Sequence, residues 1–436
     1  MDILPQILFL LLLIVAFGFF GWRMNQIRLN IFKGRDVEMQ GNKSERWRNV
    51  FLMALGQKRM FHKPLVAFFH IILLIGFVVI NIKLIEIIID GLTGTHRLFL
   101  PMLGPAAYSG FISVFEGMAL LVIISCLVFL SRRVVVGVHR LVSKEMKPWS
   151  KFDANLMLIA VGLLMVFFLN MNATDVALQN AGHPDYHNTG NFLVSSHIAA
   201  IYSGLSEGAL LNAERFFWWL HIITILGILN LIPYSKHLHI MLAFPNTYFM
   251  KLDPDGKMTN MPEVQKEVKA MMSGEESGGD DDVPDTFGAK DVEDLNWKHL
   301  LDAYACTQCG RCTEACPANM TGKLLSPRKV MIDTRERMEE KAAFEKKNGP
   351  DADDNKNLLR DYISEEELWA CTSCNACVEA CPVGIDPLSI ILEMRRNLVM
   401  EEANAPSAIN QMFNNLENNG APWQFSPEDR TKWINE

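Results

Sequence analysis

Cys306-Thr307-Gln308-Cys309 opens a pattern, Cys-x-x-Cys-x-x-Cys-x-x-x-Cys-Pro, that the chain repeats from Cys371. The two copies hold eight of the nine cysteines, namely Cys306, Cys309, Cys312 and Cys316, then Cys371, Cys374, Cys377 and Cys381. Three cysteine thiolates at this spacing can bind three irons of a [4Fe-4S] cluster from one loop, and a fourth cysteine from elsewhere in the chain completes the ligand set. The sequence therefore predicts two [4Fe-4S] clusters.

The expected ligand sets cross between the two motifs. In two-cluster proteins the fourth cysteine of each motif ligates the other cluster. We therefore expect Cys306, Cys309, Cys312 and Cys381 around the first cluster, and Cys371, Cys374, Cys377 and Cys316 around the second. Zinc ribbons match this spacing poorly because they use two separated cysteine pairs. A disulfide framework is the other alternative, and it conflicts with the reducing compartment inferred below.

The segments around the cysteines are predicted to be helical. Ser326-Pro327 offers an N-cap and an N1 proline to a charged helix ending near Lys347. Ser364 and Glu367 form a capping box before the second motif, and Asp386-Pro387 starts a further helix. No stretch alternates apolar and polar residues as a strand does. The expected fold class is all-α, with an α-helical ferredoxin domain.

Upstream of the cysteines the chain is strongly apolar. Five runs are long enough to cross ~30 Å of hydrocarbon: Ile3–Trp22, Pro64–Ile89, Tyr108–Leu130, Leu156–Met171 and Phe216–Pro233. The first run lacks the basic start and the Ala-x-Ala site of a secretory signal, so we interpret it as a retained span. The sequence predicts a five-span bundle in the lipid bilayer.

Basic residues set the expected orientation. Ten Lys and Arg lie between Arg23 and Lys63 and six between Arg132 and Lys151, whereas only Arg97 lies between spans two and three. By the positive-inside rule the N-terminus faces outward and the cysteine motifs face the cytoplasm. We expect a multi-pass protein of the inner (cytoplasmic) membrane.

The composition predicts the boundaries between the domains of the chain. We expect a membrane domain over residues 1–245, an acidic flexible linker over 246–290, the ferredoxin domain over 291–400 and a tail over 401–436. Residues 273–285 are rich in glycine and acid and cannot bury apolar surface. The formal net charge of −8 does not indicate nucleic-acid binding.

Three histidines in or beside the spans are candidate haem b ligands: His70, His221 and His239. His221 and His239 are five helical turns apart, so on a straight helix they point the same way ~27 Å apart. His237 is expected on the opposite side, and a kink at Pro233 would weaken this argument. The alternative is that each membrane histidine only hydrogen-bonds a neighbouring helix.

The spans resemble the γ (cytochrome b) subunit of respiratory nitrate reductase. The resemblance rests on Phe69-His70-Ile71, Trp219-Leu220-His221 and the stretch Ile232–Ile240. It implies that His70 and His239 hold a haem near the cytoplasm and that His221 belongs to an outer haem. The expected partner of His221 is replaced by Ile80. The outer haem is then absent, five-coordinate or completed by a histidine such as His96 or His197.

The C-terminal half resembles the C subunit of heterodisulfide reductase, through the stretches Cys381–Pro387 and Asn418–Trp423. The whole chain is similar to the electron-transfer subunit of membrane-bound heterodisulfide-reductase-like complexes. The resemblance implies a cytoplasmic catalytic subunit with paired-cysteine motifs, or electron-transfer flavoprotein, as the partner. This chain has no adjacent Cys-Cys pair and no Gly-x-Gly-x-x-Gly. No residue of this chain is therefore predicted to be catalytic.

These features together predict electron transfer between a cytoplasmic partner and menaquinone or ubiquinone. Lys83, Glu86 and Glu116 are candidates for handling quinone protons. Snorkelling to the membrane interface is the simpler interpretation of Lys83 and Glu86. A membrane anchor or a redox sensor without turnover is the alternative function, and it needs no aligned imidazoles in the bilayer.

Overall fold

The computed structural model describes residues 3–39, 41–143, 145–254, 256–274, 286–350, 352–424 and 426–435. Within these ranges the secondary structure is helical and contains no strand, which confirms the all-α prediction. The chain forms two compact units. The first contains Met1–Leu29, Gly41–Met250 and Tyr304–Gly310, and the second contains Asn30–Gln40, Lys251–Ala303 and Arg311–Glu436.

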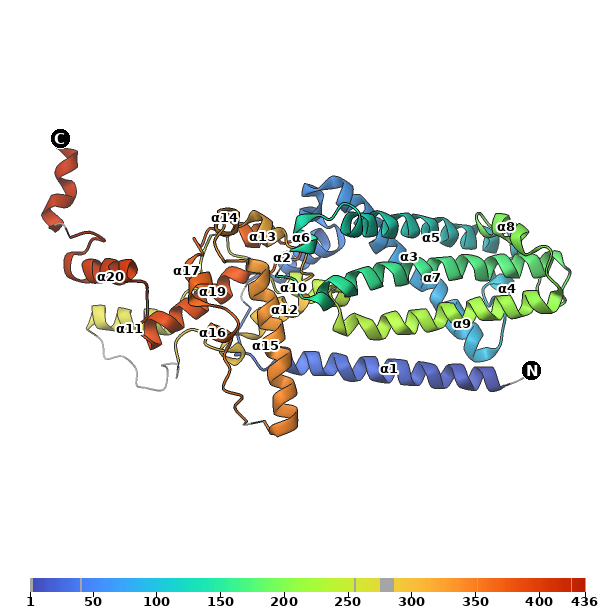
Figure 1. Cartoon of the computed structure of the whole chain (residues 1–436), viewed down its shortest axis with the longest axis horizontal. Helices are drawn as coiled ribbons and strands as arrows, with labels where there is room; N and C mark the ends of the chain where they lie inside the picture. Colours follow the sequence, from blue (N-terminus) through green and yellow to red (C-terminus); the bar gives the residue numbers. More distant parts are fainter. Residues whose placement is uncertain are drawn as a thin grey trace. The chain divides into compact units, whose positions relative to one another are not determined.

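Five long helices build the first unit: α1 (Leu4–Ile31), α3 (Pro64–Thr93), α5 (Pro105–Val134), α7 (Pro148–Asn180) and α9 (Glu207–Leu231). Each helix is long and apolar enough to cross a membrane. Helix α5 packs against α3 and α7, and α7 packs against α9; these helices are labelled in Figure 1. The five predicted spans are thus present as five helices.

The helices run beyond the apolar stretches that predicted them. Pro64, Pro105 and Pro148 each occupy the start of a helix, where a missing N–H costs no hydrogen bond. The largest difference is at α7, which continues past the predicted end at Met171 through a run of buried residues that includes Asp175. Hydropathy misses this extension because its polar side chains face the interior of the bundle.

Aromatic side chains join α1 to the bundle. Phe9 of α1 is fully buried, and its ring lies 5.2 Å from that of Trp218 on α9. Phe115 on α5 and Phe168 on α7 belong to the same buried cluster. This packing is expected to hold the helices together through close contact, since lipid is as apolar as the helix surfaces.

His221 and His239 do not lie on one straight helix, as the proline at position 233 suggested. Helix α9 ends at Leu231 and is followed by two 3-10 turns, η4 (Ile232–Tyr234) and η5 (Lys236–Leu238), before α10 (His239–Tyr248) begins. Pro233 has no N–H to continue the helix. His239 therefore sits on a new helix, and its ring lies 6.1 Å from that of His237.

Short elements connect the long helices of the first unit. They are α2 (Lys43–Asn49), the π-helix η1 (Val50–Leu55), the 3-10 helix η2 (Lys58–His62), α4 (Leu100–Leu103), α6 (His139–Val142), α8 (Ser195–Ile198) and η3 (Ala199–Tyr202).

The second unit consists of short helices and one long helix, α15 (Pro327–Asn348). The others are α11 (Pro262–Ser273), η7 (Val292–Asp294), α12 (Trp297–Ala305), α13 (Arg311–Ala315), α14 (Pro317–Met320), α16 (Leu358–Asp361), α17 (Glu365–Trp369), α18 (Ala376–Glu379), α19 (Pro387–Arg396), η8 (Asn397–Glu401), α20 (Ser407–Asn419) and η9 (Pro427–Ile434). The predicted caps are present, since Ser326 accepts from Lys329 N and Ser364 forms a capping box with Glu367.

The predicted linker is in part structured. Helix α11 lies inside the range 246–290, and it ends at Gly274 in the left-handed conformation. The most acidic part of the predicted linker, residues 275–285, lies outside the described residues. The predicted tail also contains a helix, α20.

A buried ion pair ties α15 to the segment before η7. Arg337 is 1% exposed and donates to both carboxylate oxygens of Asp291, at 2.9 and 2.8 Å. Replacing Arg337 by alanine is expected to lower the free energy of unfolding by about 3 kcal/mol, because it leaves the Asp291 carboxylate without its main partner. Thermal unfolding of the purified protein measures this. The control is Lys356→Ala, whose exposed pair with Glu340 is expected to leave unfolding unchanged.

Candidate functional site

The two cysteine loops have the same backbone shape. Gln308 and Ser373, each two residues after the first cysteine of its motif, have φ values of 54° and 55°. Gly310 and Asn375, each four residues after it, have φ values of 75° and 60°. Left-handed residues other than glycine are uncommon and gather at functional sites. The sequence duplication is therefore also a duplication of the loop conformation.

This backbone shape turns amides toward sulfur. The N–H of Gln308 donates to Cys306 Sγ, and the N–H of Ser373 donates to Cys371 Sγ, both at 3.4 Å. The amide of Ile385 donates to Cys381 Sγ at the same distance. Hydrogen bonds to cysteine sulfur stabilise thiolates and tune the potential of an iron-sulfur cluster. The loops thus fit the requirements of cluster ligands.

In the second unit, the part of the first motif that follows Gly310 lies close to the second motif. Helix α13 packs against α18, and the two helices carry Cys312 and Cys377. Burial raises the pKa of the Cys377 thiol, and Asp386, Cys371, Cys316 and Cys374 raise it further. Cys316 of the first motif is therefore close enough to Cys371 and Cys377 to interact with them electrostatically. Among the described residues no three such donors converge as a single-ion site requires, whereas a cluster spreads its four ligands over four irons.

His70 on α3 and His239 on α10 face each other in the first unit. Their ring centroids are 6.4 Å apart and their planes differ by 38°. Two imidazoles on opposite sides of one metal ion, each bound at ~2 Å, have ring centres ~6 Å apart. The separation therefore fits a pair of axial haem ligands.

Each of these imidazoles is also oriented through its Nδ1. His239 Nδ1 donates to the carbonyl of Lys236 at 2.9 Å, and His70 Nδ1 lies 2.9 Å from Oε1 of Gln57. Metal-bound histidines commonly have such a partner on the second nitrogen. Burial also lowers the pKa of His239, which favours the neutral imidazole that binds metals. Nε2 is the nitrogen that would coordinate iron in both residues.

His221 has different surroundings. It is 2% exposed, and its Nδ1 donates to the carbonyl of Leu164 at 3.1 Å, with the ring of Phe168 5.8 Å away. The two histidines considered as its partner lie elsewhere, because His96 contacts Asp175 at 2.9 Å and His197 is exposed. The structure brings neither of them to His221.

Lys83 and Glu86 are buried in the bundle, so neither snorkels to an interface. Lys83 pairs with Glu86, and its ammonium lies 3.1 Å from the hydroxyl of Tyr108. The same hydroxyl donates to Glu86 Oε1 at 3.1 Å. Arg97 extends this group, donating to Tyr108 at 3.2 Å and to Asp175 at 2.8 Å. These five residues, Lys83, Glu86, Arg97, Tyr108 and Asp175, form what we call the buried ionic cluster.

Glu116 is linked to this cluster through Asn172, whose Oδ1 accepts from Arg97 at 3.3 Å. Its Oε2 accepts from the amides of Val194 and Ser195, at 2.8 and 3.0 Å, and its Oε1 accepts from Asn172 Nδ2 at 3.0 Å and from the Ser195 hydroxyl. Four donors occupy the carboxylate, so Glu116 ties the start of α8 to α5 and α7.

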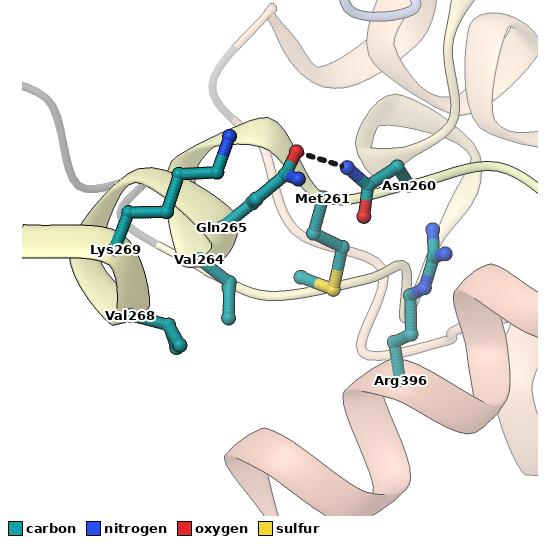
Figure 2. A pocket seen from close by; sticks show the side chains of 7 residues that line it. All are labelled: Asn260, Met261, Val264, Gln265, Val268, Lys269 and Arg396. Atoms are coloured by element: carbon teal, nitrogen blue, oxygen red, sulfur yellow. Dashed lines mark hydrogen bonds between the residues drawn. The ribbon is translucent and has the colours of Figure 1, made fainter. Parts of the chain in front are cut away.

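An open groove of about 480 Å³ lies beside α11 in the second unit (Figure 2). It is lined by Asn260, Met261, Val264, Gln265, Val268, Lys269 and Arg396. Asn260 donates to Gln265 at 2.7 Å across its edge (Figure 2). The groove includes none of the cysteines or histidines described above.

Comparison with known proteins agrees with the cysteine geometry. Residues 305–385 match the family model described as a 4Fe-4S dicluster domain. The chain carries a 4Fe-4S dicluster domain. The dicluster domain contains all eight cysteines of the two motifs, so the predicted iron-sulfur clusters are confirmed as its cofactors.

Several iron-sulfur proteins are similar to this chain. The "Probable iron-sulfur-binding oxidoreductase FadF" of Bacillus subtilis is 28% identical over 99% of the chain and 61% of its own length. The "EtfAB:quinone oxidoreductase" of Syntrophomonas wolfei is 27% identical over 97% of the chain and 58% of its own length. The "Probable membrane-anchored ferredoxin" of Chromohalobacter salexigens is 34% identical over 35% of the chain and 25% of its own length. No solved structure matches the chain.

The chain spans about three fifths of the length of the first two relatives. The predicted resemblance to heterodisulfide reductase C subunits is confirmed, since such subunits are homologous to part of the chain. The dicluster domain and the five apolar helices are the features of a membrane protein that carries iron-sulfur clusters.

Sequence reasoning missed five residues around these sites. Gln57 and Lys236 orient the candidate haem ligands. Tyr108, Arg97 and Asp175 belong to the buried ionic cluster. The positions of Arg97 and Tyr108 next to apolar spans could have indicated this cluster, because an ionisable group there is costly unless it is paired. Gln57 and the carbonyl of Lys236 carry no such signal.

Proposed function

We propose that this chain passes electrons between a cytoplasmic redox partner and the quinone pool, through two [4Fe-4S] clusters and one haem b. The observation that carries the proposal is the facing pair His70 and His239, 6.4 Å apart. The loop Tyr304–Gly310, with Cys306 and Cys309, belongs to the same compact unit as this pair. When bound, haem would supply a one-electron carrier inside the bundle.

The proposed cluster ligands are those expected from the motifs. Cys371, Cys374, Cys377 and Cys316 would hold the second cluster, and the proximity of Cys316 to Cys371 and Cys377 supports this set. Cys306, Cys309, Cys312 and Cys381 would hold the first. The equivalent amide-to-sulfur bonds at Cys306 and Cys371 support equivalent roles for the two loops.

The proposed partners follow from the names of the relatives. One relative is named for EtfAB and quinone, and others are subunits of heterodisulfide reductases. An electron-transfer flavoprotein, or a catalytic subunit with paired cysteines, would accordingly exchange electrons with the dicluster domain. Menaquinone or ubiquinone would exchange electrons at the other end of the series of redox cofactors.

A reduced-minus-oxidised spectrum of the purified protein tests this function. We expect a b-type α-band after dithionite, and reoxidation of that band when a soluble menaquinone analogue is added. A protein with full iron content but no such band would overturn electron transfer through haem. That result would favour the anchor or sensor, which needs no facing imidazoles.

The buried ionic cluster is our proposed site for quinone protons. Lys83, Glu86 and Tyr108 are joined by hydrogen bonds and can exchange protons with a bound quinone. Glu116 has no such role in the proposal because its donors are the amides of Val194 and Ser195, the Ser195 hydroxyl and Asn172, none of which is an ionisable group that could pass a proton on.

Glu86→Gln is expected to slow quinone reduction by about 100-fold, because it removes the proton-accepting carboxylate. Glu116→Gln is the matched control, since it makes the same change at an equally buried glutamate of the same bundle. We expect the control to keep its rate and to unfold at a lower temperature. Stopped-flow oxidation of the pre-reduced protein measures both rates. Equal rates for Glu86→Gln and unmodified protein would remove Glu86 from the site.

A further inference from the structure

Arg395 of α19 is hydrogen-bonded to the backbone around the first cysteine of the second motif. Its Nη2 donates to the carbonyl of Cys371 at 2.5 Å, and Nη2 and Nε both donate to the carbonyl of Leu368, at 2.6 and 3.1 Å. Its Nη1 donates to Ser373 Oγ at 3.3 Å. The guanidinium also lies over the ring of Trp369, 5.0 Å from the ring centre. One side chain therefore contacts residues before, at and after Cys371.

The fold brings Arg395 back to this loop from further along the chain. Helix α19 begins at Pro387, after the last cysteine of the motif, and the side chain of Asp386 is its N-cap. It packs against α17 and α18, which lie on either side of the Cys371 loop in the sequence. The loop and the three helices belong to the second compact unit. The last turn of α19 thus meets the start of the motif that precedes the helix.

The contacts with Arg395 enclose a strained turn. Ser373 has a φ value of 55°, and its N–H donates to Cys371 Sγ at 3.4 Å. A residue other than glycine keeps such a conformation only where its surroundings hold it. Arg395 binds the carbonyl of Cys371 on one side of this turn and the hydroxyl of Ser373 on the other. It therefore helps to hold the turn that directs an amide to the cysteine sulfur.

The same side chain brings a positive charge to the loop. A guanidinium group stays protonated in proteins. Reduction adds one negative charge to an iron-sulfur cluster, and net charge nearby is one of the factors that set its potential. Arg395 is half-buried, so its charge is screened less than that of an exposed residue. A positive charge beside Cys371 favours the reduced form of the cluster that this cysteine binds.

We propose that Arg395 is a positioning residue of the second cluster, which holds the Cys371 loop and stabilises the reduced form of that cluster. The inference rests on the proposed function, in which the second cluster carries electrons. It adds to that function a residue that sets the potential of one carrier.

Two substitutions separate the charge of Arg395 from its hydrogen bonds. Arg395→Lys keeps the charge, but an ammonium cannot reproduce the forked contacts of a guanidinium. Arg395→Gln keeps an amide donor and removes the charge. If Arg395 only holds the loop, both variants should disturb the second cluster alike. If its charge acts on the cluster, Arg395→Gln should shift the potential and Arg395→Lys should not.

The test is an EPR-monitored redox titration of both clusters in the purified full-length variants. The signal that is lost from Cys371→Ala protein identifies the second cluster. Arg395→Gln is expected to shift the reduction equilibrium of this cluster about tenfold toward the oxidised form, or about 59 mV for one electron. Arg395→Lys should leave it unchanged. The first cluster should move much less in either variant, which makes it an internal control.

Arg396→Gln is the matched control. It makes the same change of charge at the next residue of α19, whose guanidinium points elsewhere. Arg396 Nη1 donates to Glu393 Oε1 at 2.5 Å, and its Nη2 donates to the carbonyl of Thr259. We expect this variant to keep the potential of the second cluster within a small fraction of the shift in Arg395→Gln.

Three outcomes would overturn the inference: an unchanged potential in Arg395→Gln protein, equal shifts in Arg395→Gln and Arg395→Lys, or an equal shift in Arg396→Gln. If Arg395→Gln protein loses the iron of the second cluster, Arg395→Lys decides. A second cluster with unchanged potential in that variant supports the inference, whereas its loss there too would leave Arg395 a structural role only. Failure of the proposed function is a separate result, because protein without haem would still report the potentials of both clusters.

Discussion

Replacing His70 or His239 by alanine is expected to remove haem b, with a loss of the reduced α-band of at least about tenfold. The two imidazoles lie 6.4 Å apart on different helices, and each is held by its own partner through Nδ1. Loss of either leaves one ligand where two are needed for a tightly held haem. Quinone reduction should fall with the haem content, while cluster iron remains. Pyridine haemochrome and iron assays on the same preparation measure both.

His237→Ala is the matched control. His237 lies on η5, directly before α10, and its ring is 6.1 Å from that of His239. Its Nδ1 lies 3.2 Å from the hydroxyl of Ser235, and a residue two positions from His239 cannot reach the opposite side of one iron. We expect this variant to keep its haem. Haem retained in His70→Ala and lost in His237→Ala would show that the axial ligands are assigned incorrectly.

The double variant Cys316→Ala/Cys371→Ala is expected to keep about half of the iron of the unmodified protein. Under the crossed ligand sets, Cys316 and Cys371 both bind the second cluster. Both substitutions therefore affect the same cluster, and the first cluster keeps all four of its ligands. If each motif instead held its own cluster, this variant would lose both. Iron quantitation and EPR of the reduced protein distinguish the two results.

The control for this experiment is Cys312→Ala/Cys371→Ala. Its two substitutions fall on different clusters under either arrangement, so nearly all cluster iron should be lost. Non-additivity of the first pair, together with additivity of the second, is the signature of crossed ligation. The proximity of Cys316 to Cys371 and Cys377 supports the first result.

Local patterns predicted the fold well. The caps at Ser326 and Ser364 are present because a capping hydroxyl interacts with amides only two or three residues away. The five spans are recognisable because each needs about twenty apolar residues in sequence. The cysteine motifs are also local, since three ligands come from one loop.

Helix ends and helix phase were less predictable. The buried polar end of α7, which carries Asp175, has low hydropathy and was excluded from the predicted span. The phase argument for His221 and His239 assumed a straight helix, and it does not apply because α9 ends at Leu231, before Pro233. His239 nevertheless meets His70, through the packing of α3 against the segment that follows α9.

The sequence by itself determined the class of the protein, namely five apolar helices joined to a dicluster domain, because ligand spacing, capping and hydropathy act over a few residues. Only the tertiary structure decided which groups meet: His70 with His239, Lys83 with Glu86 and Tyr108, and Lys236 with His239. These contacts join residues on different helices, or depend on side-chain direction. They are set by how the helices pack, which no single stretch of sequence encodes.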